Sequence, residues 1–165
     1  MRKTALTLMT VLALLGAREA SAQTDTEGAT ASITIPTLIS IDVSNATVGF
    51  DQPTLADYTT GYIGMNSGAS VISTRSNIIH KVTIQADAAT MTGPSAKPAS
   101  DLQWGTGGAA GSFTGLTTTA ADVVGNLARG NNATAASVWY RMVLDEANDQ
   151  PGTYSLAFTY TALAN

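Results

Sequence analysis

The chain of 165 residues contains no cysteine and only one histidine. The absence of cysteine excludes disulfides, thiol nucleophiles, iron–sulfur clusters and thiolate zinc sites, so the fold must be held together by buried apolar side chains. The single histidine, His80, has no second histidine with which to share a metal, and it lies in the middle of an expected strand. We therefore interpret His80 as a packed side chain and expect no metal and no cofactor.

Basic residues are scarce and scattered. The chain has 8 Lys and Arg residues against 12 Asp and Glu residues, a formal net charge of −4 at pH 7. No cluster or stripe of positive charge is present, and binding to nucleic acid or to an anionic membrane surface depends on such a stripe. We therefore expect no nucleic-acid partner.

The only long apolar run lies at the N-terminus. Met1, Arg2 and Lys3 precede the run "TALTLMTVLALLGA", and "ASA" at 20–22 provides a small-residue cleavage site. This arrangement is typical of a secretory signal peptide, and the run is too short for a convincing membrane span. We predict that residues 1–22 are cleaved and that the protein is exported to the periplasm, the outer surface or the medium. An uncleaved N-terminal anchor is the alternative.

The expected mature chain, residues 23–165, is long enough for one ordinary core, so a single domain is predicted. It keeps 5 of the 8 basic and 11 of the 12 acidic residues, a net charge of −6. Such acidity favours solubility and does not by itself indicate a partner. No membrane span is expected in this part of the chain.

Catalytic patterns are also missing. The mature chain holds only two glutamates, Glu27 and Glu146, and nothing nominates a pair of carboxylates facing across a cleft. No nucleophile-elbow, phosphate-loop or dinucleotide-binding pattern occurs. We predict that the protein is not an enzyme, with an unrecognised carboxylate site as the remaining enzymatic alternative.

The sequence does contain repeated alternation of apolar and polar residues, which is typical of β-strands. This pattern, interrupted by Gly, Pro and Asn, predicts strands over 31–43, 67–77, 78–88, 137–146 and 153–164. With almost no helical period, it predicts an all-β fold: a single antiparallel Ig-like β-sandwich over 31–165 that follows a flexible stretch at 23–30.

Three finer expectations concern the second half of the chain. The strands over 137–146 and 153–164, joined by the turn "NDQPG", predict a β-hairpin. Short strands are expected around Trp104 and over Phe113–Leu116. The stretch 119–130 is consistent with one or two helical turns that Thr119 caps and Gly130 closes, since Val123 and Leu127 lie four residues apart.

Two weaker sites carry open alternatives. Asp145, Glu146, Asn148 and Asp149 crowd one turn, where oxygen ligands can hold calcium, but acidic hairpin turns without metal are common. Trp104 stands beside a Gly-rich stretch, where an exposed ring can stack on a sugar or anchor a partner. A tryptophan that closes the end of a sandwich core is the alternative.

The C-terminal segment "PGTYSLAFTYTALA" resembles the last strand of small secreted bacterial β-sandwich surface proteins, among them fimbrial subunits and spore-coat-U-like domains. In that group a Gly-Thr-Tyr or Gly-Thr-Phe opens an alternating strand that runs to the end of the chain. The resemblance covers about 15 residues from Pro151 onward. It implies a non-enzymatic structural or adhesive surface subunit that self-associates when an N-terminal segment completes the sandwich of a neighbouring molecule.

The N-terminal segment "ASITIPTLISIDVSN" has the form of such a donor strand. Its apolar face carries five residues, namely Ile33, Ile35, Ile39, Ile41 and Val43. The candidates for an acceptor core are Tyr154, Leu156, Phe158 and Tyr160. Pro36 divides the segment, which leaves 31–35 as a donor and 38–43 as a strand of the chain's own core.

Two alternatives to strand donation remain open. In the first, the whole segment is an ordinary first strand of the chain's own sandwich. In the second, the protein is a monomeric binding module that holds a glycan or a surface partner through loops around Trp104.

Overall fold

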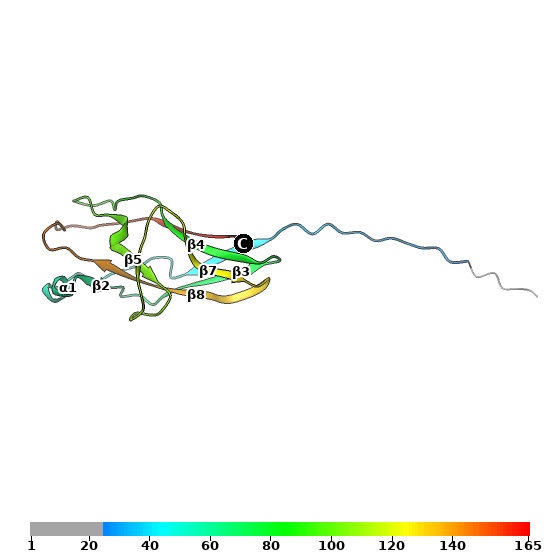
Figure 1. Cartoon of the computed structure of the whole chain (residues 1–165), viewed down its shortest axis with the longest axis horizontal. Helices are drawn as coiled ribbons and strands as arrows, with labels where there is room; N and C mark the ends of the chain where they lie inside the picture. Colours follow the sequence, from blue (N-terminus) through cyan, green and yellow to red (C-terminus); the bar gives the residue numbers. More distant parts are fainter. Residues whose placement is uncertain (1–24) are drawn as a thin grey trace, which may run out of the picture. The chain divides into compact units, whose positions relative to one another are not determined.

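The computed structural model describes residues 25–165, so the expected signal peptide lies outside the described residues. The chain divides between Ile35 and Pro36 into two units. The second unit is an antiparallel β-sandwich (Figure 1). Its elements in order are β1 (Ile39–Ser44), α1 (Leu55–Thr60), β2 (Tyr62–Gly64), β3 (Ser70–Ser76), β4 (His80–Ala86), the 3-10 turn η1 (Ala99–Asp101), β5 (Leu102–Gly105), β6 (Thr114–Gly115), β7 (Ala121–Leu127), β8 (Gly130–Val143) and β9 (Phe158–Ala164).

One sheet has six strands and the other has three. The larger sheet runs β1-β3-β8-β5-β6, with β2 also paired to β8, and the smaller runs β7-β4-β9. The long strand β8 organises the larger sheet, because its first half pairs with β3 and its second half pairs with β5 and β2. The prediction of an all-β sandwich is confirmed.

The core lies between the two sheets. On the larger sheet Ile72, Val138 and Tyr140 are buried, and on the smaller sheet Val82 and Ile84 are completely buried. On β4 and β8 these are alternate positions, and the sequence pattern placed Val82 with Ile84, and Val138 with Tyr140, on one face. The phenol hydroxyls of Tyr140 and Tyr160 are hydrogen-bonded across this core.

The predicted hairpin of β8 and β9 is wrong. The two strands belong to different sheets, and residues 144–157 carry the chain from one sheet to the other. Their apolar faces meet across the core, where the Tyr140 and Phe158 ring centroids lie 5.5 Å apart. Alternation identified the buried face of each strand, but two strands that share a core can lie face to face as well as edge to edge.

The predicted helical turns over 119–130 are also wrong, because this stretch forms strand β7. It pairs with β4, with Val124 opposite Val82 and Leu127 opposite His80. A spacing of four residues places Val123 and Leu127 on one side of a strand as well as on one side of a helix. The edge of β4 supplies backbone partners that an isolated helical turn would lack.

A helix that the sequence pattern did not suggest, α1, lies between β1 and β2. None of its residues is buried. The carboxylate of Asp57 accepts hydrogen bonds from the Thr54 N–H at 2.8 Å and from the Thr54 hydroxyl at 2.6 Å, and Gly61 closes the helix with φ 81°. The overlooked signal was therefore Thr-x-x-Asp followed by Gly, which marks helix ends rather than a helical face.

Candidate functional site: the N-terminal segment and the open seam

The N-terminal segment outside the sheets presents large apolar side chains to solvent. Residues 25–38 form no strand, and all of them are exposed. The exposed fraction is 85% for Ile33 and 70% for Ile35. A chain that exposes two isoleucines on alternate positions has an apolar strand face that nothing in the described chain covers.

Strand β1 begins where Asn77 holds the incoming chain. The side-chain NH₂ of Asn77 donates to the Pro36 carbonyl at 2.7 Å, and the side-chain oxygen of Asn77 accepts from the Leu38 N–H at 2.9 Å. Its own backbone N–H donates to the Leu38 carbonyl at 3.1 Å. Asn77 lies just after the last residue of β3, Ser76, which pairs with Ile39. β1 therefore begins at the last position where β3 can pair with it.

The structure corrects the role of three donor candidates. Ile39, Ile41 and Val43 lie in β1, which is paired with β3 of the same chain. Ile41 and Val43 pack against the hydrophobic core. The strand predicted over 31–43 is therefore six residues long, from Ile39 to Ser44, and Ile33 and Ile35 are the donor candidates that remain outside the chain's own sandwich.

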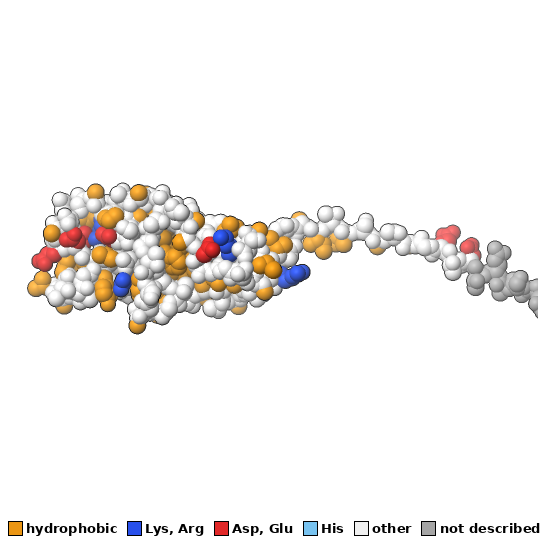
Figure 2. All heavy atoms as spheres, viewed as in Figure 1, with side chains coloured by type: hydrophobic (Ala, Val, Ile, Leu, Met, Phe, Trp, Pro, Cys, Tyr) orange, Lys and Arg blue, Asp and Glu red, His pale blue; other side chains and the backbone are white. Residues whose placement is uncertain are grey.

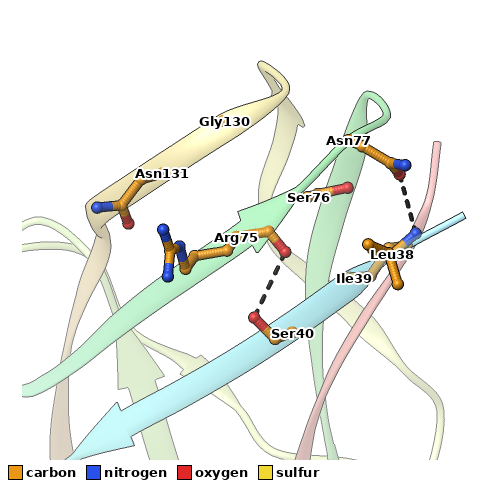
Figure 3. Close-up of a pocket in the computed structure, with 8 residues that line it drawn as sticks. All are labelled: Leu38, Ile39, Ser40, Arg75, Ser76, Asn77, Gly130 and Asn131. Carbon is orange, nitrogen blue, oxygen red and sulfur yellow. Dashed lines mark hydrogen bonds between the residues drawn. The ribbon is translucent and has the colours of Figure 1, made fainter. Parts of the chain in front are cut away.

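The two sheets meet along the edge strands β1 and β9. Each of these strands stands at the end of its sheet, so its outer edge has no strand partner within residues 25–165. The two strands contact each other, and Figure 3 shows the C-terminal strand passing the start of β1. We call this line of unpaired edges the seam.

An apolar hollow of about 300 Å³ continues the seam beyond β1 and β9. It lies between the segment that follows β1 and the segment that leads into β9. The apolar side chains that line it include Val48, Phe50, Met91, Met142, Leu156 and Phe158.

The four acceptor candidates divide between the hollow and the core. Tyr154, Leu156 and Phe158 line the hollow. Tyr160 instead points into the core, where its hydroxyl meets that of Tyr140. Burial raises the pKa of both phenols, because the charged form would lose its solvation.

Trp104 does not form an exposed binding site. It lies in β5 opposite Tyr140, and its exposed fraction is 8%. Residues 106–113 fold back over the end of β5, where a Cβ at Gly105 would lie 2.2 Å from the Ser112 carbonyl oxygen. The structure thus gives Trp104 the place of a core tryptophan, and the expected short strands around it and at Thr114–Gly115 are present.

The acidic turn at 145–149 uses several of its oxygens internally. Asp145 accepts from the Ala147 N–H at 3.0 Å and from the Asn148 amide at 2.6 Å, and Asp149 accepts from the Asp145 N–H at 3.0 Å. These hydrogen bonds lower the pKa of Asp145. Within residues 25–165, no group of three His, Asp or Glu side chains has the arrangement of a metal site.

Lys97 ties this turn to the neighbouring loop. Its ammonium nitrogen lies 2.6 Å from Asp149 Oδ1 and 3.1 Å from Asp101 Oδ2, and its side chain is 4% exposed. Burial alone would lower the pKa of Lys97, but the hydrogen bonds and charges of Asp149 and Asp101 outweigh it and raise the pKa above its ordinary value. The sequence analysis did not single out Lys97, because nothing local marks a lysine as buried.

His80 is fully buried at the start of β4. Its Nδ1–H donates to the Ile78 carbonyl at 3.2 Å, and its Nε2 accepts from the Thr74 hydroxyl at 2.9 Å. Both ring nitrogens thus have partners in the core, and this geometry makes His80 a link between the two sheets.

Comparison of the chain with family models, with curated proteins and with solved structures finds no match. None of the helices within residues 25–165 has the length and apolar character that a membrane crossing requires.

Proposed function

We propose that the protein is an exported, non-enzymatic structural or adhesive surface subunit, and that copies of it assemble when residues 31–35 of one molecule enter the seam of another. The observation that carries the proposal is that one chain has both an exposed apolar segment and an unpaired sheet edge that could receive such a segment. Ile33 and Ile35 are exposed on alternate positions, and the sandwich has an open edge with an apolar hollow. Addition of a strand to such an edge supplies main-chain hydrogen bonds, while alternate side chains enter pockets.

The dimensions are compatible with this exchange. The five residues 31–35, when extended, span about 17 Å, which fits within the span of about 23 Å of the seven residues of β9. Transfer of Ile33 and Ile35 from solvent into the hollow would contribute about 2 kcal/mol each before the cost of ordering the segment. Hydrogen bonds along the outer edge of β9 would add to this apolar contribution.

The first test compares the oligomeric state of two chains by size-exclusion chromatography with light scattering. Residues 23–165 should form large assemblies, and a chain that starts at Leu38 should be a folded monomer. The second chain keeps β1 and all of its partners in β3, so loss of assembly without loss of fold is the expected result. A monomeric longer chain would contradict the proposal.

Point substitutions make the same test without truncation. Ile33→Ser together with Ile35→Ser should abolish assembly and leave the circular dichroism and unfolding midpoint of the monomer unchanged. The matched control is Ser32→Asn with Thr34→Asn, which alters the opposite face of the same segment and should leave assembly intact. Unfolding of the isoleucine variant would show instead that these side chains belong to the chain's own core.

A further inference from the structure

The two ends of the sandwich differ in charge. One end, here called the Asn77 pole, is formed by the turns 77–79 and 128–129 and the C-terminus. The other, the α1 pole, is formed by α1 and the loops around 87–101 and 145–152. The α1 pole collects Asp51, Asp57, Asp87, Asp101, Asp145, Glu146 and Asp149. Figure 2 shows acidic side chains gathered at that end.

The Asn77 pole carries exposed cationic side chains. Its exposed cations are Arg75 and Arg129, and neither has an ion-pair partner within residues 25–165. The nearby Lys81 is already paired with Asp122 at 2.9 Å. Two guanidinium groups without an ion-pair partner among the described residues at one end favour an acidic partner there.

A hollow of about 500 Å³ surrounds Arg75 at this pole. Figure 3 shows the Arg75 side chain between Ser40 and Asn131, with Leu38 at the edge of the hollow. Leu38 is 60% exposed and offers an apolar contact beside the charge. The hollow thus combines a cation, polar hydrogen-bonding groups and an apolar side chain.

The α1 pole carries a feature that suits this hollow. The turn at 145–149 projects Asp145 and Glu146, both exposed. The carboxylate of Glu146 has no ion-pair partner in the described part of the chain. The hydrogen bonds within the turn and the ion pair of Asp149 with Lys97 hold its backbone in place, so Glu146 is presented on a preformed turn.

We infer that the hollow around Arg75 receives the Asp145–Glu146 turn of a second copy of this chain, so that consecutive molecules meet Asn77 pole to α1 pole. The inference rests on the proposed strand exchange, because the donated segment is attached at the Asn77 pole through Pro36. A donor that enters the seam from the α1 pole runs antiparallel to β9, which itself starts at that pole.

This polarity decides the form of the assembly. Contact between two Asn77 poles would be isologous and would close a dimer, but it would bring four arginines together. Contact between opposite poles is heterologous and leaves a free seam at one end and a free donor at the other, so it continues into an open filament. The charge difference therefore favours a filament over a reciprocally exchanged dimer.

Cysteine cross-linking tests the polarity directly, because the natural chain has no cysteine. Arg75→Cys and Glu146→Cys are made separately in the full mature chain, mixed, assembled and oxidised. We expect disulfide-linked pairs that contain one chain of each kind, identified by mass spectrometry. Linked pairs of Arg75→Cys alone would overturn the inference, and so would assemblies without the mixed pair.

Charge reversal gives a second readout. Arg75→Glu should slow assembly by about ten-fold at low salt, and adding Glu146→Arg to the same chain should restore the rate. Asp51→Arg, the same charge change at another exposed position of the α1 pole, is the matched control and should not restore it. Equal rescue by Asp51→Arg would overturn the role of the 145–149 turn.

These experiments give different results when the inference about the poles is wrong and when the proposed function is wrong. An unmodified chain that stays monomeric would overturn both. Assemblies that form, but that cross-link through Arg75→Cys alone, would leave strand exchange standing and overturn only the contact between opposite poles.

Discussion

Residues 31–35 and residues 39–43 carry nearly the same pattern of isoleucine alternating with small or polar residues, yet they have different places in the molecule. The first stretch lies outside both sheets with Ile33 and Ile35 exposed, and the second is β1 with Ile41 and Val43 packed on the core. Their side chains do not account for the difference. What differs is the neighbour, because β3 ends at Ser76 and offers no backbone partner before Ile39.

This comparison shows what an alternating pattern means on its own. It specifies a strand with one apolar face, but the molecule that covers this face is decided by which edge is available. For 39–43 the available edge is β3 of the same chain. For 31–35 the available edge would be the seam of another copy.

The largest effect that we expect is a loss of folding stability at alkaline pH. It concerns only the folded unit from Pro36 onward and not the exposed residues 31–35. Folding raises the pKa of Lys97 from its ordinary value of 10.5 and the pKa values of Tyr140 and Tyr160 from 10.0. Each group holds its proton more tightly in the folded state, so its stabilising contribution is complete below the unfolded pKa and is lost as pH rises through the folded pKa. The free energy of unfolding should therefore fall above about pH 10.

Denaturant titrations across alkaline pH measure this effect. The full mature chain, kept monomeric by dilution, and the chain that starts at Leu38 should lose stability over the same pH range, because Lys97 and both tyrosines lie in the shared unit. Tyr160→Phe should make the decline shallower. Stability that stays flat or rises up to pH 11 would contradict the expectation.

A pair of alanine substitutions tests the comparison itself. Ile41→Ala removes a side chain that packs on the core from β1 and should lower the free energy of unfolding by about 2 kcal/mol. Ile35→Ala removes the same atoms from an exposed position and should change it by less than about 0.5 kcal/mol. Urea unfolding of the monomeric chains provides both values, and equal losses would mean that the two stretches share one core.

Sequence patterns were sufficient for the fold class and for the buried faces of β4 and β8. They did not predict which strand pairs with which. The apolar faces of β8 and β9 are equally consistent with a hairpin and with two sheets that pack together. The Val123 and Leu127 spacing of β7 fits both helix and strand, and the edge of β4 decides between them.

The same reason limits what the sequence reveals about the candidate site. The alternating isoleucines mark an apolar strand, but the division at Leu38 depends on the end of β3 and on the side chain of Asn77. Arg75 is the one charged residue of β3, and only the fold places it in a hollow. For Trp104 the sequence left an exposed ring and a core tryptophan open, and the pairing of β5 with β8 buries it.

The smallest expected effect concerns why β1 starts only at Ile39. One cause is the end of β3, which offers no partner before Ile39, and the other is Pro36. Proline has no N–H to donate and is disfavoured within a paired strand, so it could end β1 by itself. In this structure, however, residue 36 already faces the turn after β3, and its carbonyl accepts from Asn77 rather than from a strand.

Pro36→Ala should therefore leave the amides of residues 33–37 fast in hydrogen exchange and change the stability of the monomer by less than about 0.5 kcal/mol. Protection that spreads back to Ile35 in the monomeric variant would mean that proline, and not the length of β3, keeps these isoleucines available to another molecule.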